Sequence, residues 1–238
     1  MAGAFNVNYP TIDDFQANEV GIIGKTEILW QPLYDYAVYP TAGIGVLPFF
    51  QVPQGQGFTS QQVAAATAKT FADTNMTQAG QLPSPQAFWV DGIEVSIEPG
   101  SIATANLWAD VLPSAFVAVA AATNFPGVND FLIVAKSGLL QFSIMQKNYY
   151  QDGPLTRFPQ SVAARYDGAL ASNSATTGGL ATYLPRLAGT PCRFEPGFGI
   201  GTMENFNCQL TWPALVATAA NNARIGVHLN GWLFRAAQ

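Results

Sequence analysis

The stretch FWVDGIEVSIE, Phe88–Glu98, decides the fold class of this chain. From Ile93 to Glu98 apolar and polar residues alternate strictly. A period of two residues is typical of a β-strand that turns one face to a core and the other to water. We therefore expect the carboxylates of Glu94 and Glu98 to lie on a solvated face.

The first half of the stretch is out of phase with the second, and the slip falls at Asp91-Gly92. Glycine can adopt the positive φ of a bulge or tight turn, so the slip predicts a kink in the strand. The C-terminal stretch Ile225–Arg235 has the same form, with its break at Asn230-Gly231. The sequence therefore predicts antiparallel strands that are kinked at defined positions.

Other segments carry weaker signals. Lys25–Tyr39 is expected to form two short strands divided at Pro32, because proline interrupts a strand. Further strands are predicted at Val46–Val52, Phe131–Ala135, Leu139–Met145, Cys192–Glu195 and Phe206–Trp212. Helices are predicted at Thr59–Phe71, where a capping box precedes alanines, and at Ser161–Ala171. Gln146–Gln160 and the glycine-rich run 196–201 are interpreted as a loop and a turn, and Ser101–Ala122 fits either a helix or a strand.

With 238 residues the chain is long enough for one large all-β domain. We expect residues 1–24 to be an N-terminal arm and residues 25–238 to be a single domain, with a helical insertion near 59–71. Many short alternating strands with long loops predict an all-β, antiparallel β-sandwich of about eight strands.

Charged residues make up only 11% of the chain, against about a quarter in a typical soluble domain. The net charge is −5 and no two of the ten basic residues are adjacent, which argues against direct nucleic-acid binding. A neutral surface of a secreted or halotolerant protein would explain the low charge. We slightly favour a subunit that hides surface in an assembly, because interface centres are depleted of charge.

The sequence shows no basic and apolar leader at its start, so we expect no signal peptide. The longest apolar run, Ala115–Ala122, is too short for the roughly 20 residues that span a bilayer. Cys192 and Cys208 could pair or stay free, and both alternatives remain open.

No pattern in the chain predicts catalysis. His228 is the only histidine, and spacing places no partner beside it, so we interpret it as a surface or interface residue. No spacing of His, Cys, Asp and Glu predicts a metal site. We therefore expect no catalytic residues, no metal and no cofactor, and we do not expect an enzyme.

Tyr149, Tyr150, Arg157 and Phe158 are the strongest recognition candidates. Tyr, Phe and Arg are enriched at protein interfaces, so these residues and His228 are candidate subunit-interface residues. The alternative, that the loop packs its aromatic rings on its own sandwich, is equally well supported.

Taken together, the features resemble those of the jelly-roll major capsid proteins of tailless icosahedral viruses and bacteriophages. The resemblance lies in the arm without a signal, the low-charge surface rich in Gln and Asn, the helix between early strands, and the terminal strand IGVHLNGWLFR (residues 225–235). It implies a single jelly roll and a structural protein that self-assembles into trimeric or hexameric capsomers. The resemblance also implies a place in the virion after assembly in the host cytoplasm, beside other virion proteins and in many such viruses around an internal membrane.

Two alternatives compete with the capsid hypothesis. A carbohydrate- or receptor-binding β-sandwich, such as a lectin or a viral attachment module, would expose an aromatic platform, whereas a capsid subunit would bury loop aromatics between subunits. An enzyme of the cupin type would need a histidine cluster for its metal, which one histidine does not supply.

Overall fold

The computed structural model describes residues 26–57, 68–100, 126–159, 164–171, 180–187, 191–218 and 221–236. The strands are β1 (Thr26–Trp30), β2 (Leu33–Tyr39), β3 (Val46–Phe49), β4 (Ala87–Gly100), β5 (Leu139–Ile144), β6 (Lys147–Asp152), β7 (Ala164–Ala171), β8 (Leu180–Leu187), β9 (Cys192–Ile200), β10 (Phe206–Thr211) and β11 (Asn221–Ala236). The helices are α3 (Pro126–Ser137) and the short 3-10 helix η1 (Leu155–Arg157). Neither described helix has the length and apolar character needed to cross a bilayer.

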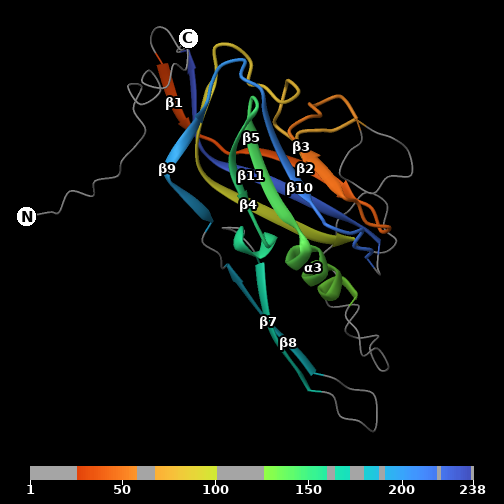
Figure 1. Cartoon of the computed structure of the whole chain (residues 1–238). Coiled ribbons are helices and arrows are strands. Elements are labelled where there is room, and N and C mark those ends of the chain that lie inside the picture. The colour runs from red at the N-terminus through yellow and green to blue at the C-terminus, as the bar shows by residue number, and fades with distance from the viewer. Residues whose placement is uncertain are drawn as a thin grey trace, which may run out of the picture.

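Two antiparallel sheets form the body of the protein (Figure 1). The first sheet has five strands in the order β1-β11-β4-β9, and β2 pairs with β11 on the same side as β1. The second sheet has four strands in the order β3-β10-β5-β6. The expected all-β antiparallel sandwich is therefore confirmed.

The strand pairing has the nested order of a jelly roll. β2 pairs with β11, β3 with β10, β4 with β9 and β5 with β6, so that the chain folds back on itself like one long hairpin. Successive strand pairs of this long hairpin belong alternately to the first and to the second sheet. Rolling such a hairpin into two facing sheets gives the double Greek key of the jelly roll.

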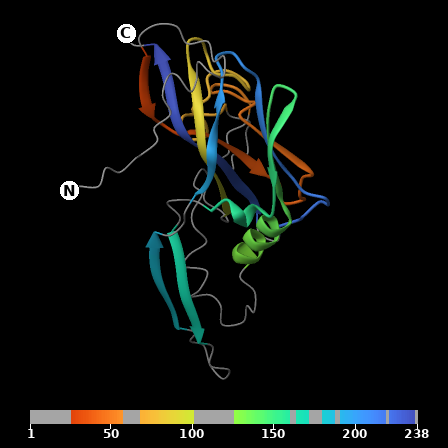
Figure 2. The same ribbon diagram turned by 60° about the vertical axis from the view of Figure 1, so that its left-hand side comes forward.

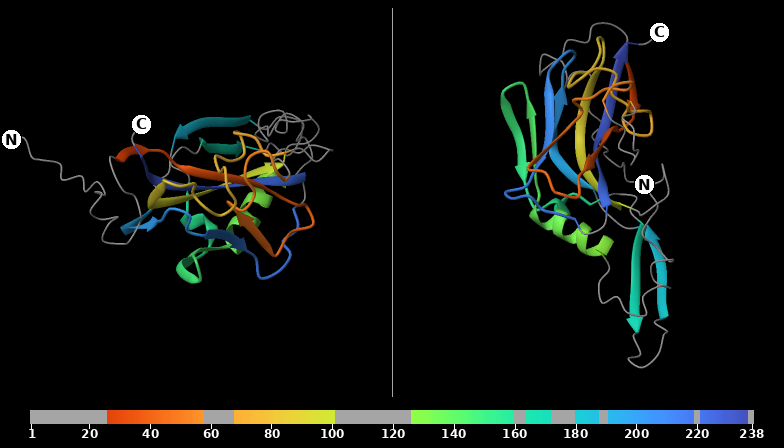
Figure 3. Two further views of the ribbon diagram at one scale, coloured as in Figure 1. Left: turned by 90° about the horizontal axis from the view of Figure 1, so that it is seen from above. Right: turned by 90° about the vertical axis from the view of Figure 1, so that its right-hand side faces the viewer.

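The core lies between the two sheets, which Figure 3 shows as facing layers. In the central strands alternate residues point inward and are buried, such as Ile93 and Val95 from β4 and Phe142 from β5. Each fully buried side chain of this size contributes about 1.5–3 kcal/mol relative to exposure. The predicted alternation of β10 is confirmed, with Phe206, Cys208 and Leu210 buried.

A register shift is present at both predicted positions, which lie opposite each other, and the extra residue is Asp91 of β4. The register between β4 and β11 shifts between Asn230 and Gly231, beside the shift between Val90 and Gly92 in the pairing of β4 with β9. A Cβ atom on Gly231 would lie 1.8 Å from the carbonyl oxygen of Trp89, so only glycine fits there. The bulge brings Val90 back to the inner face and turns Trp89 outward.

The expectation of a solvated outer face at Glu94 is wrong. Glu94 and Ser96 are both buried, although they lie on the face of β4 opposite to the core. β4 is a central strand between β11 and β9, and the side-chain amide of Asn230 on β11 donates a hydrogen bond to Glu94. The side chain of Glu98 lies outside the described residues.

Two segments have the opposite secondary structure from the one predicted. Phe131–Ala135 belongs to α3 and not to a strand. The prediction was wrong because a short apolar run in the sequence fits either element. The described part of Ser161–Ala171 is strand β7, which pairs with β8 along its whole length. Figure 2 shows this hairpin extending away from the two sheets.

Two predicted irregular segments are also strands. Gln146–Gln160 contains β6 and η1, and the glycine-rich run 196–201 continues β9 as far as Ile200. Gly197 of β9 serves close packing and not a turn. A Cβ on Gly197 would lie 2.4 Å from the indole nitrogen of Trp89 and 2.5 Å from the carbonyl oxygen of Val90.

Several predictions fall outside the described residues. These are the arm at 1–24, the ambiguous segment 101–122 and most of the predicted helix at 59–71. The described end of that predicted helix, 68–71, is not helical but forms a loop and turn. The division of Lys25–Tyr39 at Pro32 is confirmed by β1 and β2.

Candidate functional site

Four of the five predicted site residues lie together at one edge of the sandwich. Tyr149 and Tyr150 belong to β6, the edge strand of the second sheet, and Arg157 and Phe158 follow in and after η1. β9, the edge strand of the first sheet, supplies further aromatic rings to the same place. Aromatic rings from the edge strands of both sheets therefore pack against one another at this edge of the sandwich.

Tyr150 is the centre of this aromatic edge. Its ring lies 4.8 Å from that of Phe194 and 5.9 Å from that of Phe158, both edge-on. Its hydroxyl donates to the Asp152 carboxylate at 3.1 Å and lies 3.9 Å from the Cys192 sulfur. Burial raises the pKa of Tyr150, and Cys192 and Asp152 raise it further, so the phenol is neutral at physiological pH.

Phe158 is fully buried, and its carbonyl oxygen accepts a hydrogen bond from the Val95 amide at 2.9 Å. The segment after η1 is thereby fixed to the second half of β4. Arg157, by contrast, is exposed and pairs with the Asp152 carboxylate at 2.9 Å. An exposed pair of this kind contributes only about 0–1 kcal/mol to stability.

Tyr149 is the most accessible ring of the edge, with 43% of its surface exposed. It packs against Phe198 at 5.5 Å, and the Lys147 ammonium lies 5.2 Å from its ring centroid. Of the predicted interface residues in this segment, Tyr149 and Arg157 are exposed, whereas Tyr150 and Phe158 pack on their own sandwich. Their role at a subunit interface stays a prediction.

The sequence interpretation missed Phe194 and Phe198. Both rings belong to β9, and Phe194 lies 5.2 Å from Phe198. Their spacing of four residues puts them in phase on one strand face, a signal that Pro196 and Gly197 between them obscure.

His228 lies apart from the aromatic edge, on the outer face of the first sheet. Its Nε2 is in hydrogen-bond contact with the Tyr36 hydroxyl at 3.0 Å, and its ring stacks on that of Tyr34 at 5.9 Å. Glu94 lies directly opposite on β4. Burial lowers the pKa of His228, Glu94 raises it and Arg224 lowers it, with a net shift downward.

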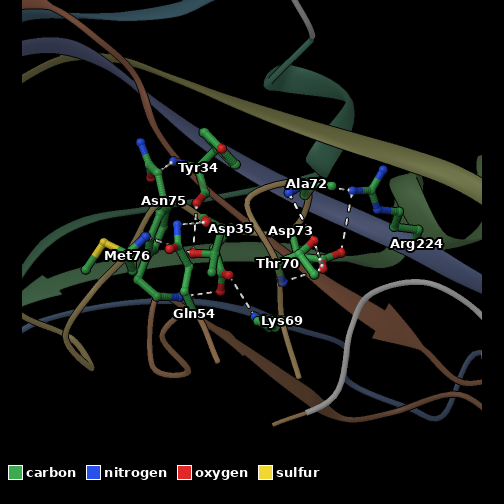
Figure 4. A network of polar contacts seen from close by, with 12 residues as sticks. Tyr34, Asp35, Gln54, Lys69, Thr70, Ala72, Asp73, Asn75, Met76 and Arg224 are labelled. Atoms are coloured by element: carbon green, nitrogen blue, oxygen red, sulfur yellow. Dashed lines mark hydrogen bonds and ion pairs between the residues drawn. The ribbon is translucent and has the colours of Figure 1, made fainter. Parts of the chain in front are cut away.

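Arg224, which lies near His228, also contacts the loop around Asp73. Figure 4 shows the contacts of Arg224 with this loop. Its guanidinium donates to the carbonyl oxygen of Ala72 at 2.6 Å and lies 3.8 Å from the Asp73 carboxylate. The Tyr34 hydroxyl donates to the carbonyl oxygen of Phe71 at 2.6 Å. The loop is thus held against β2 and β11 by side chains of both strands.

A buried ion pair anchors the start of the same loop (Figure 4). Lys69 Nζ and Asp35 Oδ1 are 2.7 Å apart, with 6% and 1% of the side chains exposed. The other carboxylate oxygen of Asp35 accepts the Phe50 amide at 2.7 Å. Burial nevertheless outweighs Lys69 and raises the pKa of Asp35.

In the part of the chain that the structure describes, no three or more His, Cys, Asp and Glu side chains are grouped to hold a metal ion. Cys192 and Cys208 are both free thiols, so the alternative of a disulfide between them is not realised. Cys208 lies in the core and Cys192 beside Tyr150.

One aromatic ring stands out on the outer face of the first sheet. Trp30 of β1 is 54% exposed and packs edge-on against Trp232 of β11 at 5.0 Å. An exposed indole beside a second ring is the kind of surface on which a sugar can stack.

No protein-family model matches this chain, and no curated protein and no solved structure matches it either. The geometry of the described residues is therefore the basis for any function assigned to it.

Proposed function

We propose that this chain is a structural capsid subunit, which assembles with copies of itself into trimeric or hexameric capsomers of an icosahedral viral shell. The jelly-roll order of its strands supports this proposal, since that fold builds many viral capsid domains. The same fold also builds lectins and cupins, so the strand order alone does not select among them.

The observation that carries the proposal is the placement of the few charges. The chain has 11% charged residues, and in the part that the structure describes four of them, Asp35, Lys69, Asp73 and Glu94, are buried. The surface therefore carries fewer charges than it would if every charged residue of the chain were exposed. A surface with little charge repels copies weakly, and the centres of stable interfaces are depleted of charge. A shell subunit needs such surfaces on more than one side.

Static light scattering of the purified chain over a range of concentration and salt tests this proposal. We expect trimers, hexamers or larger regular assemblies that persist on dilution. Salt should change the assemblies only weakly, because the proposed contacts are uncharged. A monomer under every condition would contradict the proposal.

A carbohydrate-binding function is the alternative, and Trp30 is the observation that favours it. Under this hypothesis the exposed indole is the aromatic platform of a sugar site. A glycan array would then give binding that the Trp30→Ala variant loses, while Tyr149→Ala, which removes another exposed ring on the second sheet, keeps it.

A further inference from the structure

The outer face of the second sheet, as its four described strands present it, is built from uncharged side chains. In β10 and β5 the buried residues alternate with residues that face away from the core. The strand register places their neighbours from β3 and β6 on the same face. We call this surface the amide face, and it comprises Val46, Pro48, Leu139, Gln141, Ser143, Asn148, Gln151, Asn207, Gln209 and Thr211.

Side-chain amides run across the middle of the amide face. Gln209 lies directly opposite Gln141 on one side and Pro48 on the other. The Gln209 amide nitrogen donates to the Gln141 side-chain oxygen at 3.0 Å, and Asn207 donates to the Gln209 oxygen at 3.4 Å. These bonds hold the central amides in place.

None of the residues of the amide face is ionisable. The outer face of the first sheet differs in composition, because it carries the ionisable residues Glu94, Arg224 and His228, of which Glu94 is buried. Soluble proteins commonly place Lys and other charges on exposed sheet surfaces and edges to prevent association. The amide face lacks this protection, which is the charge depletion found at interface centres.

We propose that two copies of this chain pack through their amide faces in a two-fold symmetric contact. In such a contact a residue near the axis meets its own copy, so any charge there would face a like charge. An amide carries both a donor and an acceptor and can therefore pair with an identical amide, whereas a carboxylate or an ammonium group cannot. Three neighbouring glutamines of the amide face, Gln151, Gln141 and Gln209, satisfy this requirement.

The contact rests on the proposed self-assembly and specifies one surface of it. Two sheets that stack face to face lie about 10 Å apart, which brings side chains of both copies into contact over four strands each. The partner of this surface is a second copy of the same chain, not a differently charged protein.

Charge variants of Gln209 test the contact. Gln209→Lys and Gln209→Glu each place like charges opposite each other, and we expect either variant alone to raise the dissociation constant of the assembly by about tenfold or more. An equimolar mixture of the two variants should restore association, because opposite charges then meet. Sedimentation velocity of the full chain measures all three samples.

The matched control uses Gln56, an exposed residue of the loop after β3 that lies outside the amide face. Gln56→Lys and Gln56→Glu should assemble like the wild type. Recovery in the Gln209 mixture also shows that both variants fold, since unfolded chains would not recover.

The outcomes separate this contact from the proposed function. If the wild type assembles and the Gln209 variants assemble equally well, or if the mixture does not recover, the amide face is not the two-fold contact while the capsid hypothesis stands. If the wild type stays monomeric, both proposals fail.

Discussion

The guanidinium of Arg224 lies over the ring of Tyr36, with 3.7 Å between the guanidinium carbon and the ring centroid. This arrangement depends on the absence of a side chain at Gly226, because a Cβ there would lie 2.4 Å from the Tyr36 ring and 2.5 Å from the Ser96 hydroxyl. Tyr36 therefore lies across Gly226, between Arg224 and His228. One glycine thus allows a histidine, an arginine and a tyrosine to share one sheet face.

Gly226→Ala should displace the Tyr36 ring and destabilise the fold. We expect a loss of about 1–3 kcal/mol in the free energy of unfolding, as for other overpacked positions. Gly45→Ala is the matched control, because no atom lies within 4 Å of the Cβ that it would add. Urea unfolding measures both variants, and equal effects of the two substitutions would contradict this account of Gly226.

His228 should make stability depend on pH. Its pKa is lowered in the folded chain relative to its ordinary value of 6.5, so the unfolded chain takes up the proton first as the pH falls. This contribution to stability is therefore complete above about pH 6.5, decreases as the pH falls below that value, and levels off below the folded pKa.

The groups that face His228 are Tyr34 and Tyr36 from β2, Glu94 from β4 and Arg224 from β11. Urea unfolding from about pH 8 to about pH 5 should give a slope that His228→Gln reduces. The same slope in the variant and in the wild type would assign the pH dependence to other groups.

The Asp35–Lys69 pair should behave as a buried pair in which neither partner is tolerated alone. Lys69→Met leaves the Asp35 carboxylate buried without its cation, and we expect a loss of about 3–5 kcal/mol in stability. The double variant Asp35→Asn, Lys69→Met should lose less than the sum of the single variants, because the introduced asparagine carbonyl can still accept the Phe50 amide. Additive losses in urea unfolding would show that the two side chains are not coupled.

The two thiols should differ in reactivity. Cys208 is fully buried, and burial raises its pKa, so a thiol reagent should reach it only in the unfolded chain. Cys192 is half-buried at the aromatic edge. We expect mass spectrometry to find label at Cys192 in the native protein and at both cysteines in denaturant. Native labelling at Cys208 would contradict its place in the core.

Alternation in the sequence predicts the strands with one buried face, such as Phe206–Thr211, and glycine predicts the kink at Asn230-Gly231. The remaining features depend on residues distant in the chain. Glu94 is buried beside Asn230, 136 positions further along the sequence. The glycine-rich part of β9 is extended because Gly197 packs on Trp89, and no local pattern contains that contact.

The candidate site likewise depends on residues that are distant in the chain. Tyr149 and Tyr150 could be singled out from their local composition, but their partners Phe194 and Phe198 come from the other sheet. The segment predicted to be a loop contains a strand because β6 pairs with β5 on both sides of a register shift at Tyr149. Pairing across the sheet therefore decides these elements more than their own residues do.

The most direct test of the capsid hypothesis is negative-stain electron microscopy of the purified full chain. We expect regular particles, or capsomers of uniform size that extend into sheets or shells as the concentration rises. Isolated molecules of monomer size at every concentration would contradict it.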